Sequence, residues 1–215
     1  AIEAALRTPG FAAFELVSLN DDYGQGTALV GVLNVFWKQK GYATPQTFSR
    51  FDAPVVPLVR IPGFVYVNTD TLHATAEIAN FSAQAINNGV CEWRLTGDDG
   101  RVIRSGAFAT RDIPLGNNIP LGTLKIPLSG ITRAEQLDLS IAVRGTRYAN
   151  DWHLWVYPAH VTADTEGIYI CHTLDESATR MLAHGGKVLL DCSGNVAMGR
   201  DISMHFLPVF WNTRS

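Results

Sequence analysis

The sequence predicts a mainly β protein: an immunoglobulin-like β-sandwich flanked by an N-terminal β/α barrel remnant and a C-terminal partial α/β unit. Two observations predict the sandwich. Apolar and polar residues alternate with a period of two over much of the middle of the chain, and turn signals separate the alternating runs. A third observation, a strand-helix-strand pattern near the C-terminus, predicts the α/β unit. We therefore expect three domains, over residues 1–50, 51–160 and 161–215.

The first fifty residues are typical of one strand-loop-helix unit. A short helix from Ile2 ends near Pro9 and Gly10, the apolar run Phe14–Leu19 predicts a strand, and Thr27–Lys40 predicts a helix that stops at Gly41. A parallel strand whose two faces must be covered is not stable alone. We therefore expect this unit to be the end of a barrel whose other strands are missing. Its open edges predict self-association.

The middle of the chain carries the strand pattern. Strict alternation predicts strands at Leu72–Phe81, Val90–Leu95 and Leu137–Val143, and Trp93–Arg104 is the clearest hairpin, with Gly97-Asp-Asp-Gly100 as its turn. Roughly seven short strands over about a hundred residues are typical of an immunoglobulin-like sandwich. No pair of cysteines is placed to bridge its two sheets.

The C-terminal part predicts a β-α-β unit with parallel strands. The strands are Gly167–Cys171 and Lys187–Cys192, joined by the helix Glu176–His184. A capping box at Thr173–Glu176 opens this helix, and glycines close it. Another apolar stretch, Val209–Thr213, follows.

Composition and charge exclude several classes of protein. The net charge is −3, no lysine or arginine run occurs, and no apolar run approaches the ~20 residues that cross a bilayer, so nucleic acid and membranes are not expected partners. Cys91, Cys171 and Cys192 are widely spaced and fall in predicted strands, where a free cysteine is a small buried apolar side chain. The six histidines form no ligand pattern. We expect no metal and no cofactor.

Three stretches carry a resemblance to a known family. The segment from Ile2 to Phe11 and the run Gly24-Gln-Gly-Thr-Ala-Leu-Val-Gly31 resemble the last barrel unit of glycoside hydrolase family 2 enzymes, in particular large bacterial β-galactosidase-like members. Asn150–Pro158 resembles the closing strand of the sandwich that follows the barrel there. Gly186–Leu190 and Pro208–Thr213 resemble the start of a flavodoxin-like, glutamine-amidotransferase-like accessory domain.

The resemblance implies a function for a larger protein. Family members hydrolyse β-glycosides, such as β-galactosides, with retention, using two glutamates on the fourth and seventh barrel strands. The resemblance aligns the first residues of this chain with the helix after the seventh strand, so it implies no catalytic residue here. It implies a non-catalytic portion that braces the barrel and shapes the carbohydrate site. A periplasmic or secreted bacterial location is the expectation that follows.

The loop before the predicted helix holds the candidate substrate-binding residues. They are Asn20, Asp21, Asp22 and Tyr23, at the position of a barrel rim. Relatives have His-Asp-aromatic-Pro here, so the loop differs from the family pattern. One interpretation gives Asp21 a role in ordering a sugar site. The other gives it a structural role, as a loop carboxylate that accepts backbone N–H bonds.

The aromatic residues leave a second function open. Trp152 and Trp155 lie three apart in a predicted strand and therefore face opposite sides. An outward tryptophan can stack on a sugar ring or can be buried by a neighbouring domain. The alternative to a piece of a glycosidase is thus a stand-alone carbohydrate-binding or protein-interaction module.

Overall fold

The computed structural model describes the chain except residues 12, 17, 23–28, 163–164 and 196–215. It forms two compact units, residues 1–160 and 161–215. The described residues of the larger unit form α1 (Ile2–Leu6), α2 (Pro45–Phe51), β1 (Val55–Arg60), β2 (Val65–Val67), β3 (Thr71–Asn80), β4 (Ile86–Gly89), β5 (Cys91–Gly97), β6 (Val102–Ala107), β7 (Arg111–Ile113), β8 (Gly116–Pro127), β9 (Glu135–Val143) and β10 (Ala149–Tyr157). The smaller unit holds β11 (Ile168–Cys171), α3 (Glu176–Ala183) and β12 (Lys187–Leu190).

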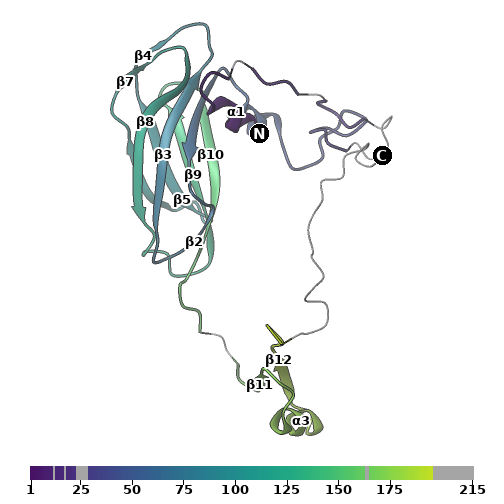
Figure 1. The fold of residues 1–215 in the computed structure, drawn as a ribbon. Coiled ribbons are helices and arrows are strands. Elements are labelled where there is room, and N and C mark those ends of the chain that lie inside the picture. Colours follow the sequence, from purple (N-terminus) through teal and green to yellow (C-terminus); the bar gives the residue numbers. More distant parts are fainter. Residues whose placement is uncertain (12, 17, 23–28, 163–164, 196–215) are drawn as a thin grey trace. The chain divides into compact units, whose positions relative to one another are not determined.

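Two sheets pack face to face in the larger unit (Figure 1). One has the strand order β1-β3-β8 and the other the order β2-β10-β9-β5-β6, while β4 and β7 form a small ribbon. All neighbours in the two sheets are antiparallel except β2 and β10, which run parallel. The predicted mainly β fold with an immunoglobulin-like type of sandwich is confirmed. The predicted boundaries of the three domains stay predictions.

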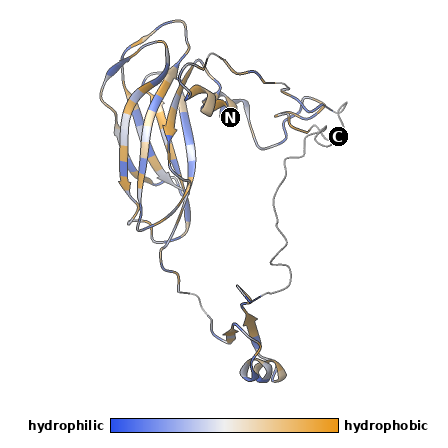
Figure 2. Ribbon diagram, viewed as in Figure 1, coloured by the Kyte–Doolittle hydropathy of each residue, from blue (hydrophilic) through white to orange (hydrophobic). Residues whose placement is uncertain are grey.

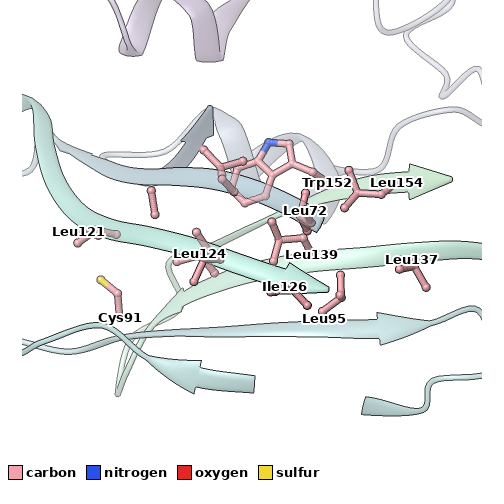
Figure 3. Close-up of a cluster of buried hydrophobic side chains, with 14 of the residues drawn as sticks. Leu72, Cys91, Leu95, Leu121, Leu124, Ile126, Leu137, Leu139, Trp152 and Leu154 are labelled. Carbon is pink, nitrogen blue, oxygen red and sulfur yellow. The ribbon is translucent and has the colours of Figure 1, made fainter. Parts of the chain in front are cut away.

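The core lies between the two sheets and follows from the alternation in the sequence. Along β9 the residues Leu137, Leu139, Ile141 and Val143 are fully buried, and each is separated from the next by a residue on the other face. The alternating bands of colour along the strands in Figure 2 show the same pattern. Figure 3 shows Leu side chains from both sheets meeting around Trp152.

Cys91 lies in this core as an unpaired thiol. Burial raises its pKa to about 11, so the thiol stays protonated at neutral pH. Cys171 is also buried and unpaired, as expected. Cys192 is predicted above to be buried and to lie in a strand. Both predictions are wrong, because this residue is exposed and lies beyond the end of β12.

The N-terminal helix α1 covers the outer side of the smaller sheet. Leu6 packs in a second apolar cluster with Val56, Leu58 and Ala79, so β1 is buried on both of its faces. The Glu3 carboxylate accepts hydrogen bonds from Asn150 Nδ2 at 2.6 Å and from Trp152 Nε1 at 3.1 Å. The first helix is therefore part of the sandwich's packing.

The barrel remnant predicted for residues 1–50 is wrong in its secondary structure. The described residues of Phe14–Leu19 form no strand, and the described residues of Thr27–Lys40 form no helix. The physical reason is that only part of the apolar stripe finds cover: Leu29 and Phe36 are 65% and 77% exposed, while Val32 and Leu33 between them are half-buried. A helix of this length is marginal without tertiary packing.

A compact loop replaces the predicted helix. Asn34 closes a turn, because its Oδ1 accepts from the backbone N–H groups of Phe36 and Lys38. The Asp21 carboxylate is buried, accepts the Gly31 N–H at 2.9 Å and pairs with Lys40 Nζ at 2.6 Å. Gly31 packs so closely on the backbone of Asn20 that an added Cβ would lie 2.2 Å from its carbonyl carbon.

The smaller unit confirms the β-α-β pattern. Strands β11 and β12 pair in parallel, and α3 connects them. The helix N-cap is Asp175, whose Oδ1 accepts the Ala178 N–H at 2.7 Å, and not Thr173 as the capping box predicted. Gly185, at φ +76°, ends the helix. The described residues show no flavodoxin-like sheet beyond these two strands, and Val209–Thr213 lies outside the described residues.

Replacing Leu6 with alanine tests the docking of α1. We expect Leu6→Ala to lower the free energy of unfolding by about 2 kcal/mol, since it empties part of the second apolar cluster. Leu16→Ala is the matched control, because Leu16 is 47% exposed. Urea unfolding followed by tryptophan fluorescence measures both. Equal effects of the two variants would contradict the docking.

Replacing Asp21 with asparagine tests the structural role of this carboxylate. We expect Asp21→Asn to open the loop of residues 29–40 to proteolysis several-fold faster, because Lys40 loses its partner in a buried site. The melting temperature of the sandwich should change little, since the described residues of this loop contribute nothing to the core. Asp22→Asn, at an exposed residue, is the control. Unchanged cleavage of Asp21→Asn would contradict the assignment.

Candidate functional site

The candidate site is the outer face of the five-stranded sheet, which is the face turned away from the core. On β10 this face carries Asp151, His153, Trp155 and Tyr157, because the residues between them point inward. On β9 it carries the residues between the buried ones, which are Gln136, Asp138, Ser140 and Ala142. On β5 it carries Glu92, Arg94 and Thr96.

An aromatic pair marks one end of the outer face. Trp155 is 39% exposed and Tyr157 is 47% exposed. The parallel edge strand β2 places Val65 beside Trp155 and Val67 beside Tyr157, and both valines are exposed as well. The two aromatic rings therefore lie on an apolar strip at a rigid sheet edge. The prediction that Trp152 and Trp155 face opposite sides is confirmed, since Trp152 is 8% exposed.

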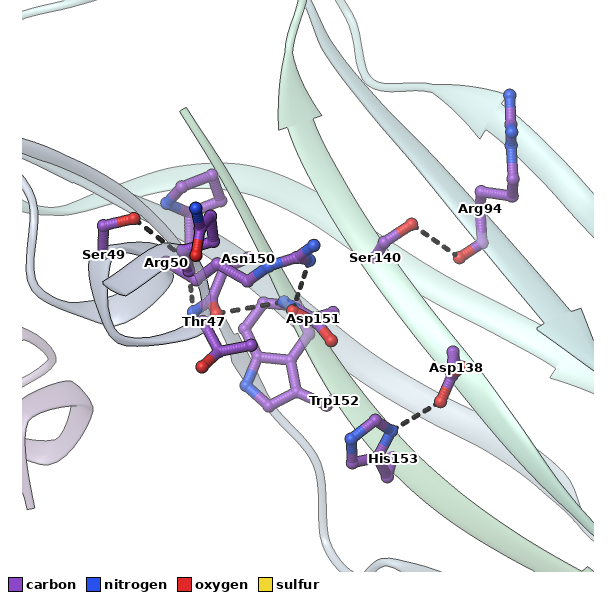
Figure 4. A network of polar contacts seen from close by, with 12 residues as sticks. Thr47, Ser49, Arg50, Arg94, Asp138, Ser140, Asn150, Asp151, Trp152 and His153 are labelled. Atoms are coloured by element: carbon purple, nitrogen blue, oxygen red, sulfur yellow. Dashed lines mark hydrogen bonds and ion pairs between the residues drawn. The ribbon is translucent and has the colours of Figure 1, made fainter. Parts of the chain in front are cut away.

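A row of polar side chains crosses the sheet next to the aromatic pair. Asp138 Oδ1 lies 2.5 Å from His153 Nδ1 (Figure 4). Gln136 Nε2 lies 3.1 Å from both of these atoms. Gln136 is the register partner of Trp155, and Asp138 is the partner of His153. These three side chains thus hold each other in place beside the tryptophan. Their remaining donors and acceptors face solvent.

A hollow opens at the other end of the outer face. Its volume is about 610 Å³, and small side chains from β6 and β9 line its floor, which are Ser105, Ala107, Ser140 and Ala142. Arg94 and the ion pair of Glu92 with Arg144 flank it. The hollow forms because the described residues of the neighbouring strands carry small side chains at these positions.

Helix α2 lies beside β10. Arg50 pairs with Asp151 at 2.5 Å, which ties α2 to β10 (Figure 4). This helix was not predicted, although the sequence carries a signal for it: Thr44 caps the helix by accepting the Thr47 N–H at 3.2 Å, and Pro45 begins its first turn.

The described residues predicted from the rim loop, Asn20, Asp21 and Asp22, are not among the strand residues of this face. Asn20 is half-buried and donates from Nδ2 to the Asp21 carbonyl oxygen at 3.1 Å. Asp21 is buried in the ion pair with Lys40, and Asp22 is exposed. Tyr23 lies outside the described residues. Their role in substrate binding stays a prediction.

Metal binding and membrane crossing find no support in the described ranges. No group of three or more His, Cys, Asp or Glu side chains there is arranged to hold a metal ion. No helix in those ranges is long and apolar enough to cross a membrane.

Two parts of the chain match family models that carry no known function. Residues 70–158 match a model described as a domain of unknown function, DUF8488, and residues 169–215 match a second one, DUF8487. A search of curated proteins finds no match.

Solved structures show distant similarity. The CARDB domain of the PF1109 protein from Pyrococcus furiosus aligns over 48% of this chain and 93% of its own length, at 8% identity and a TM-score of 0.37. A β-glucuronidase from Parabacteroides merdae aligns over 48% of this chain and 14% of its own length, at 13% identity and a TM-score of 0.35. A family 123 glycoside hydrolase from Clostridium perfringens aligns over 56% and 31%, at 12% identity and a TM-score of 0.35. The similarity is therefore distant, and it leaves the function of this chain open.

Proposed function

We propose that the β-sandwich is a non-catalytic carbohydrate-binding module and that the sugar binds to the outer face of the five-stranded sheet. The observation that carries this proposal is the aromatic pair. Trp155 and Tyr157 point outward from one strand, two residues apart, and remain partly exposed.

The chemistry of the outer face matches that of a sugar. A pyranose ring has an apolar C–H face and a rim of hydroxyl groups, so it needs a flat apolar surface beside hydrogen-bonding groups. Trp155 and Tyr157 supply the surface. Gln136, Asp138 and His153 supply donors and acceptors within one strand of it. Because these groups lie on paired strands, they are more precisely held than groups on loops.

The arrangement of carboxylates supports binding without catalysis. Retaining hydrolysis of a glycoside needs two carboxyl groups about 5 Å apart across one bond. On the outer face Glu92 pairs with Arg144, Asp138 with His153 and Asp151 with Arg50. No two of these carboxylates are register partners on neighbouring strands. In this proposal Glu92 and Asp151 thus act in structural ion pairs, and Asp138 acts in a structural hydrogen bond.

A second candidate function is the one that the family resemblance implies. Under this second proposal, the chain is a non-catalytic portion of a glycoside hydrolase and braces the rest of that enzyme. The observation that favours it is the set of large apolar side chains exposed on the loop segment of residues 11–42, which are Phe11, Phe14, Leu16, Leu19, Leu29, Val30, Phe36, Trp37 and Tyr42. Such a concentration is typical of a surface that packs on another protein part.

Replacing Trp155 with alanine tests carbohydrate binding. We expect the purified chain to bind at least one glycan in a panel, and Trp155→Ala to weaken that binding about ten-fold or more, because the stacking surface is lost. Trp37→Ala is the matched control, since Trp37 is an exposed tryptophan that belongs to no strand of this sheet. Isothermal titration calorimetry measures the affinity. The proposal is contradicted if no glycan binds or if both variants bind alike.

Replacing three exposed apolar residues tests the bracing function. We expect the triple variant Leu29→Ser, Val30→Ser and Phe36→Ser to reduce self-association of the chain while leaving the unfolding of the sandwich unchanged. Sedimentation velocity over a range of concentrations measures this. A wild-type chain that stays monomeric at all concentrations would contradict an unsatisfied packing surface. The control is Val161→Ser, another exposed apolar position.

A further inference from the structure

Among the described residues, the acidic and arginine side chains of the outer face each contact a polar or charged partner, with one exception. Arg144 is fully engaged, because its Nε and Nη2 atoms lie 2.8 and 2.7 Å from Glu92 Oε1. Asp138 and Asp151 have their own partners, His153 and Arg50. In the part of the chain that the structure describes, the guanidinium group of Arg94 has no hydrogen-bond or ion-pair partner.

Arg94 stands at the hollow described above. It lies on β5, and its register partner on β9 is Ser140, one of the small residues of the floor (Figure 4). A guanidinium group presents N–H donors in a planar fork that matches a carboxylate in two parallel hydrogen bonds. The hollow therefore combines room for a substituent with a cation that fits a planar anion.

We propose, resting on the proposed function, that the ligand is an acidic oligosaccharide and that Arg94 binds the carboxylate of a uronic acid residue in the hollow. The aromatic pair then binds another residue of the same sugar chain. The Glu92–Arg144 pair bounds the hollow on the other side, and its negative charge is already neutralised, so it does not repel the ligand's carboxylate.

The separation of the two subsites sets the length of the ligand. Ser140 lies four residues along β9 from Gln136, the partner of Trp155, and β5 and β10 flank β9 on opposite sides. This places Arg94 about 14 Å along the strands and about 10 Å across them from Trp155, or about 17 Å in total. A ligand that reaches both subsites is thus an oligosaccharide of several residues and not a monosaccharide.

The test compares acidic oligosaccharides with their neutral methyl esters. We expect the wild-type chain to bind a uronate oligosaccharide about ten-fold or more tightly than its methyl ester by isothermal titration calorimetry, with a preference that falls as salt rises. Arg94→Gln should lose the preference and keep the affinity for the ester. Arg104→Gln is the matched control, because Arg104 is exposed and pairs in register with the inward-facing Leu95.

The outcomes separate this inference from the function on which it rests. Trp155→Ala should weaken the binding of acid and ester alike. If the chain binds neutral glycans through Trp155 but Arg94→Gln leaves the preference unchanged, or no preference exists, the inference about Arg94 is overturned and the proposed function stands. If no glycan binds, or if Trp155→Ala leaves the binding of acid and ester unchanged, both are overturned. Thermal unfolding of each variant checks that Arg94, an exposed residue, is not needed for folding.

Discussion

The alternation of inward and outward side chains along β9 and β10 is the constraint on which the rest of the larger unit depends. Leu137, Leu139 and Ile141 fill the core only if Gln136, Asp138 and Ser140 lie on the outer face. A slip of one residue in register would exchange the two sets. The free energy gained by burying the leucines therefore fixes the position of the outer polar row, although those polar residues contribute little to stability themselves.

A second constraint concerns the outer side of the smaller sheet. Strand β1 is apolar on both faces, and Val56 and Leu58 need a cover that the opposite sheet cannot give. Helix α1 supplies it, and the Glu3 carboxylate adds hydrogen bonds to Asn150 and Trp152 on β10. Helix α1, which is far from β10 in the sequence, thus contacts strands of both sheets. This is why the start of the chain behaves as part of the sandwich, and it also explains why α1 was predictable while the segment after it was not.

The difference between the predicted and the observed elements has a physical cause. Strands β3, β5 and β9 and helix α3 were predictable because their patterns are local and their burial partners are in this chain. The pattern of Thr27–Lys40 also indicates a helix, but Leu29 and Phe36 at its ends stay exposed. The Asn34 side chain and Trp37, at φ +61°, turn the chain instead. Strand β8 was not predicted because Gly116, Pro120 and Gly122 interrupt its alternation at register shifts.

One feature of the candidate site follows from the pattern of a single strand, and another depends on how several strands pair. The outward position of Trp155 follows from counting residues along one strand. The hollow beside Arg94 depends on the register of β5, β6 and β9 together, because only that register brings the small residues of two strands beside one arginine. Two carboxylates on this face pair with arginines and a third contacts His153, so no pattern within a single strand indicates that one arginine is left over. Contacts across strands, and not the composition of any strand, thus determine which charged group of the outer face lacks a partner among the described residues.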